Sequence, residues 1–504
     1  MLEKNINQKD FFKSKNEYTT RDFILLGICI LFYMLFPIMD GPEWCADSNG
    51  YATMHITREP VYPIFLAVCR GIASLINVDY LMIVVVLQSL LAAFTTWYAG
   101  IVIKKVKDGS IVLQIGTVFF QFFVTLLCRF VAGRGSAYTN SILTEGLGLS
   151  LFVLFIVNLF LAVRMKKTGS MVWTFVLAFL LISLRKQMMI VLPTMCIVFF
   201  WYYLLRERRW KKFLLLVALT CAVLFAGKLF DRTYNYVVRG AWIEHSGNSM
   251  GLLCTLLYSS NPEQDQHLFE DEVVKELYLQ IMDAAVAQEL VYTTAPEDGT
   301  RWLTLSTHYA DSYDAIGYGI INPVVEGYIA DNHDYNEIER ALKYDEICGE
   351  MTKTLFRQKP GPLVEVYFYN TWKGFVNSIA LAKPLLSLMA LGLYLGMGVV
   401  AIYLCIWIRK QKKVLLQDSA VDRNEQKERM ISDKIVQIET SLTFTFVTMV
   451  GIAINALVVG LMIFSQPRYM IYGMGLFYTA GSMMLYDVWK IVKSNMDRNT
   501  DRKN

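Results

Sequence analysis

Ten long runs of apolar residues constrain the fold of this chain more than any other feature. A helix of about 20 mainly apolar residues is long enough to cross the hydrocarbon core of a bilayer. Charged residues make up 18% of the chain, below the quarter or so that is usual in soluble domains. The sequence therefore predicts an all-α polytopic membrane protein with about ten transmembrane helices. The runs are 23–39, 80–103, 110–131, 143–163, 170–184, 187–205, 212–230, 384–408, 438–464 and 470–491.

Short clusters of lysine and arginine between these runs predict the orientation of the chain. Short cytoplasmic loops are enriched in Lys and Arg. Ten spans place both termini and every such cluster in the cytoplasm. The net charge is only +4, and the basic residues form no continuous patch, which argues against a nucleic-acid partner. The segments assigned to the cytoplasm are 1–22, 104–107, 164–167, 206–212, 409–434 and 492–504.

Residues 61–77 are apolar but short, and they test this topology. If they crossed the bilayer, the lysines at 104–107 would lie outside. Arg70 interrupts the run, Pro60 precedes it, and Pro63 is its third residue. We therefore expect an amphipathic helix lying on the outer interface, within a first outer loop over 40–79.

Two long polar stretches interrupt the predicted spans: one lies between the membrane module 23–230 and the C-terminal transmembrane helices 384–491, and the other lies within 384–491. Residues 231–383 are long enough for a small extracytoplasmic domain, and apolar spacing predicts helices within 270–290 and 335–358. Residues 409–434 are charged and show no apolar face, so they are expected to be a solvated cytoplasmic connector.

The cysteine, histidine and N-terminal patterns indicate neither a metal site nor a removed leader. The nine cysteines are scattered without a CxxC pair, as expected for small core hydrophobes. The five histidines are dispersed and form no HExxH, so we expect no tightly bound metal, although a loosely held divalent cation stays open. No small-residue cleavage site follows residues 23–39, which predicts a retained helix.

Charged residues at the outer ends of several predicted helices mark the candidate site. Charges near membrane depth are costly, so groups from different helices are expected to converge on one water-filled cavity. The alternative for any single Arg or Lys is snorkelling at the interface. The residues are Asp40, Asp47, Arg58, Arg134, Glu145, Arg185, Lys186 and Arg468.

The segment DSNGYATMHITREPVYP, residues 47–63, favours a chemical role for Asp47. A carboxylate held on a short loop can remove the proton of an acceptor hydroxyl during sugar transfer, while Arg or Lys stabilises the charge on a departing phosphate. Asp47 is the favoured base. Asp40, at the end of the first helix, is the rival carboxylate, with a plain polar helix exit as its alternative.

The pattern D-S-x-x-Y followed by R-E-P-V-Y-P-x-F-L resembles the first outer loop of GT-C membrane glycosyltransferases, the group that includes protein O-mannosyltransferases and lipid A aminoarabinose transferases. One difference is that protein O-mannosyltransferases place two adjacent acids there, whereas Ser48 follows Asp47. Three other elements are similar to those of the group: Thr144-Glu145-Gly146-Leu147, Leu184-Arg185-Lys186-Gln187 through Pro193, and Ser465-Gln466-Pro467-Arg468-Tyr469.

This resemblance implies a GT-C-like fold and a polyprenyl-phosphate-sugar donor. It implies inverting transfer on the extracytoplasmic face of a bacterial cytoplasmic membrane, to an envelope glycan, lipid or protein. Asp47 would be the base, and Glu145 would line the same cavity, with a helix-start acid as its alternative. The lipid phosphate would be held by residues from the set Arg58, Arg185, Lys186 and Arg468.

Other residues and functions stay open on the sequence alone. His55 is either a substrate contact or a hydrogen-bonded loop histidine, and Tyr62 either stacks a sugar ring or belongs to an interfacial aromatic belt. Tyr469 belongs to the same R-Y element as Arg468. The alternative function is a multi-span transporter or a flippase for lipid-linked sugars, although no related halves are evident. A receptor or scaffold is a third class.

Overall fold

The computed structural model describes residues 18–131, 135–297, 300–332, 334–418 and 425–501. Regular secondary structure in these residues is entirely helical. The one strand-like feature in this part of the chain is an isolated parallel bridge between Glu43 and Ser141. The expected all-α class is therefore confirmed.

Every predicted span coincides with a helix. Eight helices are long and apolar enough to cross a membrane by length and composition: Thr20–Asp40, Tyr80–Val106, Ile111–Phe130, Glu145–Arg164, Lys186–Arg206, Trp210–Arg239, Pro384–Leu415 and Glu428–Met462. The helices at the other two predicted spans are α8 (Thr168–Leu184), which has 17 residues, and α21 (Met474–Asp501). The number of crossings therefore stays a prediction, while the polytopic class is supported.

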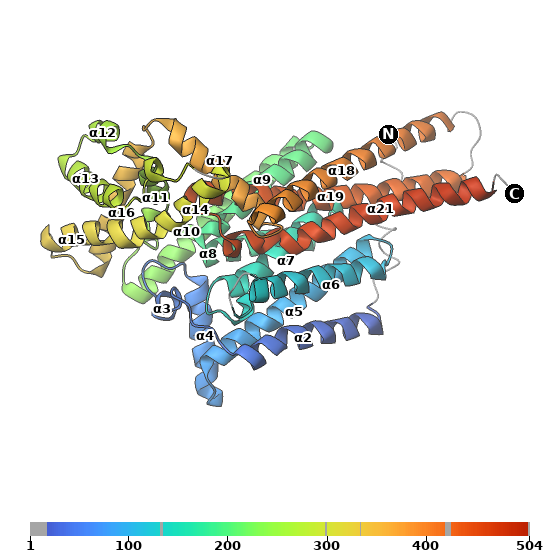
Figure 1. Cartoon of the computed structure of the whole chain (residues 1–504). Helices are drawn as coiled ribbons and strands as arrows, with labels where there is room; N and C mark the ends of the chain where they lie inside the picture. The colour runs from blue at the N-terminus through green and yellow to red at the C-terminus, as the bar shows by residue number, and fades with distance from the viewer. Residues whose placement is uncertain (1–17, 132–134, 298–299, 333, 419–424, 502–504) are drawn as a thin grey trace.

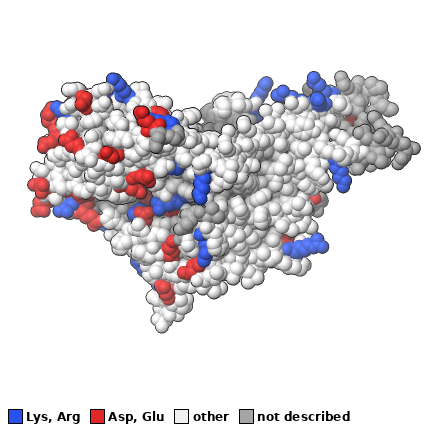
Figure 2. Space-filling view, viewed as in Figure 1, with Lys and Arg blue, Asp and Glu red and all other residues white. Residues whose placement is uncertain are grey.

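The long helices run along one direction and leave an apolar belt between two charged ends. Figure 1 shows α2 (Thr20–Asp40), α5 (Tyr80–Val106) and α6 (Ile111–Leu126) beside α7 (Glu145–Arg164), and Figure 2 shows few charged side chains across the middle of this face. On α18 (Pro384–Asp418), apolar side chains such as Leu385, Leu395 and Val399 are exposed. Such a surface is suited to lipid rather than water.

Residues 61–77 form a helix that crosses the bundle direction. Helix α4 (Val61–Ile76) is flanked by Pro60 at its N-cap and by Asn77 at its C-cap, where a φ of 53° is left-handed (Figure 1). Tyr62 and Leu66 are buried against the bundle, whereas Val68 and Leu75 are exposed. The predicted helix is confirmed, and its apolar outer face is compatible with the expected interfacial position.

The segment 231–383 packs as a helical body around its own apolar core at one end of the bundle (Figure 1). Helix α10 (Trp210–Arg239) leads into it, extending beyond the predicted end of its span at 230. Asn336 and Glu339 cap the helix Glu337–Leu355 reciprocally. The body holds 23 Asp and Glu but only 11 Lys and Arg, so its surface is acidic. Its helices are α11 (Met250–Ser259), α12 (Pro262–Asp265), α13 (Glu272–Ala287), α14 (Arg301–Asp314), α15 (Asn322–Asn332), α16 (Glu337–Leu355) and α17 (Pro360–Asn377).

The predicted solvated connector over 409–434 is helical in both of its described parts, and Ile431 gives it a buried apolar contact that the sequence did not indicate. Helix α18 continues to Asp418, and α19 (Glu425–Met462) begins directly after a six-residue gap in the described chain. Ile431, Ile435 and Ile438 form a buried apolar stripe against α18 and α21. The charges surrounding the first two of these isoleucines had concealed the helical spacing.

Ion pairs hold helices together at the end of the bundle opposite the acidic body: Lys107 at the end of α5 pairs with Asp487 of α21, and Glu439 of α19 pairs with two arginines. Lys107 Nζ lies 2.5 Å from an Asp487 carboxylate oxygen, and both side chains are at most 3% exposed. Arg164 and Arg206 approach the same Glu439 carboxylate, at 3.8 and 2.7 Å. Several of the basic residues from which we predicted the topology therefore also hold helices together.

Candidate functional site

Five of the predicted charged residues meet at the end of the bundle that carries the acidic body. They come from four separate segments: the first outer loop, the start of α7, the end of α8, and α20 (Pro467–Met470). These residues, here named the ion cluster, are Asp47, Arg58, Glu145, Arg185 and Arg468.

Asp47 is positioned by the short helix α3 (Ser48–Ala52), which it precedes. One carboxylate oxygen accepts a hydrogen bond from Arg58 at 2.9 Å, and the other lies 3.6 Å from Arg468. A Cβ added at Gly50 would lie 2.7 Å from Arg58 Nε, so glycine gives the guanidinium room to cross α3. The Asp47 side chain keeps 28% of its surface exposed, which leaves it accessible to a ligand.

Glu145 is the first residue of α7 and is almost completely buried. Its carboxylate lies 2.5 Å from Arg185 Nη1 and 3.7 Å from Arg468 Nε. Thr144 donates to Glu145 at 3.3 Å and accepts from Arg185 at 3.2 Å. Arg468 therefore contacts both carboxylates and joins Asp47 to the buried Glu145–Arg185 pair.

Tyr469 supports the two inner arginines. The guanidinium carbons of Arg185 and Arg468 lie 4.9 and 4.8 Å from its ring centroid, within cation–π range. Arg468 also donates to the Tyr469 hydroxyl at 2.7 Å. Gln187 and Asn455 both donate to the Tyr469 carbonyl at 2.8 Å. Tyr469 is 5% exposed, so its ring orders the arginines rather than facing solvent.

The rival carboxylate lies apart from the ion cluster. Asp40 ends α2 and accepts hydrogen bonds from Arg129, one of them at 2.9 Å. Arg129 sits in a π-helical turn over Leu127–Val131, which continues α6. The structure thus gives Asp40 a separate partner. Arg134, another predicted site residue, lies outside the described residues.

The side chains of three further predicted residues do not belong to the ion cluster. Tyr62 is completely buried, with its hydroxyl donating to Gln88 at 2.9 Å, so its predicted sugar-stacking role is corrected. Helix α4 turns that ring toward the bundle. His55 is half exposed, and it contacts Thr57 at 2.9 Å and Glu337 at 3.8 Å. The Lys186 side chain is exposed beside the cluster.

A second polar group beside the ion cluster was missed from the sequence. His245 Nδ1 lies 2.6 Å from Asp231, and its Nε2 lies 4.0 Å from Glu59, which also accepts from the Lys186 backbone N–H. Burial opposes the charged imidazole, but the Asp231 hydrogen bond and nearby Glu59 raise the pKa of His245. These residues come together only because the loop after α10 packs against the loop 40–79, and no local sequence pattern indicates that packing.

Asp314, at the end of α14, also belongs near the ion cluster. Partial desolvation raises the pKa of its carboxyl, with Arg468 lowering it and Asp47 raising it. The acidic body therefore contributes a carboxylate to the surroundings of Asp47. No motif in the sequence marked this residue.

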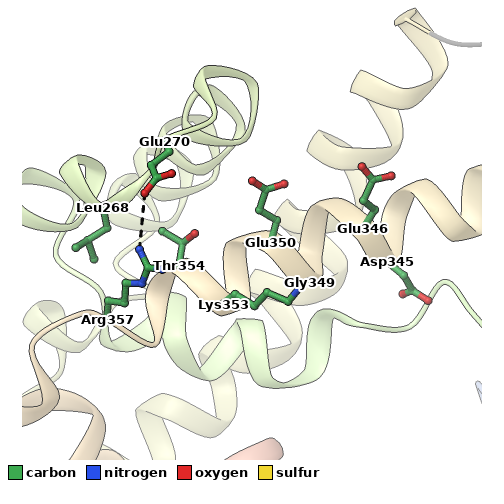
Figure 3. A pocket seen from close by; sticks show the side chains of 9 residues that line it. All are labelled: Leu268, Glu270, Asp345, Glu346, Gly349, Glu350, Lys353, Thr354 and Arg357. Carbon is green, nitrogen blue, oxygen red and sulfur yellow. Dashed lines mark ion pairs between the residues drawn. The ribbon is translucent and has the colours of Figure 1, made fainter.

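A groove elsewhere on the acidic body has a different character. It encloses about 420 Å³ between α16 and the segment around Leu268 (Figure 3). Its walls mix Glu346, Glu350 and Lys353 with an exposed Arg357–Glu270 pair at 4.0 Å. None of the residues predicted from sequence lines it.

The ion cluster is suited to an anion. Its three guanidinium groups and two carboxylates carry one net positive charge, with Asp314 as a further carboxylate nearby, and Arg binds phosphate oxygens bidentately. Among the described side chains, no group of three or more His, Cys, Asp and Glu is placed to hold a metal ion.

Comparison of the chain with protein-family models, curated proteins and solved structures gives no match in any of the three. The geometry of the ion cluster is therefore the basis for a functional proposal.

Proposed function

We propose that this protein is a GT-C-like membrane glycosyltransferase that moves a sugar from a polyprenyl-phosphate donor to an envelope glycan, lipid or protein. The reaction takes place on the extracytoplasmic face of a bacterial cytoplasmic membrane. The observation that carries the proposal is the position of Asp47, an accessible carboxylate in contact with Arg58 and Arg468. The proposed base is therefore in direct contact with two of the proposed phosphate-binding arginines.

In the proposed reaction, Asp47 accepts the proton of the acceptor hydroxyl. The hydroxyl oxygen attacks the anomeric carbon, a new C–O bond forms, and the bond from that carbon to the phosphate oxygen breaks. The electron pair leaves with polyprenyl phosphate, and attack opposite the leaving group inverts the anomeric centre. No redox change and no tightly bound cofactor are required.

Arg58, Arg185 and Arg468 would stabilise the negative charge that develops on the departing phosphate. Glu145 would hold Arg185 and Arg468 in place, since its buried carboxylate contacts both. Tyr469 would keep the same two guanidinium groups aligned. Such preorganised charges are effective because they need little rearrangement during reaction.

A transporter or lipid-linked-sugar flippase is the rival function. It would also place charged groups near helix ends, but it would have no need of a proton acceptor beside phosphate-binding arginines. Formation of a new glycosidic bond distinguishes the two functions.

The cellular test deletes the gene, profiles the envelope glycans, and restores wild type, Asp47→Asn or Asp283→Asn. Asp283 is an exposed acid on α13 and serves as the matched control. We expect loss of one sugar decoration, restored by wild type and Asp283→Asn but not by normally expressed Asp47→Asn. Full restoration by Asp47→Asn would contradict the assignment, and loss with Asp40→Asn instead would identify the rival base.

A further inference from the structure

A small internal cavity lies between the predicted transmembrane helices. It measures about 50 Å³ and is bounded by α2, α5, α6, α7 and the turn before α21. Its lining includes many hydroxyl and amide groups and no Asp, Glu, Lys or Arg. The polar lining residues that matter here are Tyr33, Thr95, Thr96, Gln121, Thr125 and Tyr472.

Three residues that line the cavity each carry a buried polar atom with no hydrogen-bond partner among the described residues. These atoms are Thr95 Oγ1, Gln121 Nε2 and Tyr472 Oη. Thr95 and Tyr472 are 3% and 2% exposed. A buried polar group without a partner costs about 1–3 kcal/mol, and surrounding hydrocarbon offers no replacement. One hydrogen-bonding molecule in the cavity would reduce this cost for all three groups.

We infer that this cavity is a binding site for ordered water, which hydrogen-bonds to Thr95, Gln121 and Tyr472. A cavity holds a water molecule once its volume reaches about 10–15 Å³ and two or more polar groups line it. The neutral lining and the Gln121 amide donor favour water over a cation, since an N–H group repels a cation. This inference does not depend on the proposed sugar transfer.

The water site lies behind the ion cluster. Gly146, which lines the cavity, follows Glu145, and Tyr472 follows Tyr469 by one helical turn. Water at this depth would complete the hydrogen bonding of the bundle next to the buried Glu145–Arg185 pair. The site would thereby stabilise the wall against which that pair packs.

The test compares thermal unfolding of purified full-length wild type, Thr95→Val, Tyr472→Phe and the double variant. If water bridges the two hydroxyls, Thr95→Val lowers the apparent Tm by roughly 2 °C, and the double variant loses less than the sum of the single losses. If the cavity is dry, replacing an unpaired hydroxyl by a methyl group raises the Tm and the two effects add.

Thr96→Val is the matched control, because the Thr96 hydroxyl bonds directly to Tyr33 at 3.0 Å. It should lower the Tm additively with Tyr472→Phe. Hydroxyl-radical footprinting gives an independent measurement. Modification of Tyr472 well above that of the fully buried Tyr309, whose hydroxyl bonds to Thr255, is expected. Equal protection of both tyrosines would overturn the inference.

Discussion

At the scale of single residues, Arg468 is the most connected member of the ion cluster. It lies 3.6 Å from Asp47 and 3.7 Å from Glu145, and it stacks on Tyr469. Lysine keeps the charge but loses the planar, two-point geometry. We expect Arg468→Lys to lower kcat/KM for the donor by about 10- to 100-fold, in line with one charged hydrogen bond. Steady-state kinetics with a polyprenyl-phosphate sugar measures this change, and an unaltered kcat/KM would remove Arg468 from the donor site.

His245 predicts a pH dependence of stability. Because its folded pKa is raised, the His245–Asp231–Glu59 contact contributes fully below the ordinary histidine pKa of about 6.5. The contribution is lost as pH rises through the folded pKa. Thermal unfolding between pH 6 and 8 should therefore show a falling Tm, and His245→Gln should flatten the profile. A profile that is the same in both proteins would contradict this assignment.

At the residue scale, the sequence predicts residues that lie in local motifs but not those that tertiary packing brings together. Asp47, Glu145 and Arg468 were predicted because local motifs surround them. Asp314 and His245 come near the site only because the acidic body packs on the first outer loop, and no local pattern encodes that packing. Tyr62 was misjudged for a related reason, since the face that α4 buries depends on its neighbours in space.

At the scale of elements, one buried ion pair joins the end of α5 to α21, and its lysine also hydrogen-bonds to α19. Lys107 contacts Asp487 and Ser441 and donates to the Gln437 carbonyl. Removing one partner of a buried pair leaves an uncompensated charge, at a cost of about 3–5 kcal/mol. We expect Lys107→Met to lower unfolding stability by that amount, and Lys107→Met with Asp487→Leu to recover most of it. A double variant no better than the single would show that the pair's attraction, not its isolated charge, dominates.

Helix positions followed from the sequence because apolar periodicity and length are local properties. All ten predicted runs are helical, and both predicted helices of the acidic body formed as α13 and α16. The segment 409–434 differed because charged side chains on an extended helix resemble those of a solvated loop. Its buried stripe needs α18 and α21 as partners, which the sequence window does not contain.

At the scale of the whole molecule, we predict that the ion cluster lies on one side of the membrane. We expect the C-terminal end of α18 and the N-terminal end of α19 to lie on the other side (Figure 1). Asn49 and Lys410 are exposed at these two ends. In intact cells, a membrane-impermeant maleimide should label Asn49→Cys above the wild-type background and Lys410→Cys only after permeabilisation. The reverse labelling would place Asp47 in the cytoplasm, where the proposed donor site does not belong.

The most direct measurement is sugar transfer by purified full-length protein in lipid nanodiscs. Labelled polyprenyl-phosphate sugar and an envelope acceptor fraction are supplied to wild type, Asp47→Asn and the control Asp283→Asn. The account predicts that label moves to the acceptor with wild type and Asp283→Asn, and that Asp47→Asn, with an unchanged melting temperature, retains less than about a thousandth of the rate, in the range expected for loss of a general base. Equal rates for wild type and Asp47→Asn, or no donor consumption by either, would contradict it.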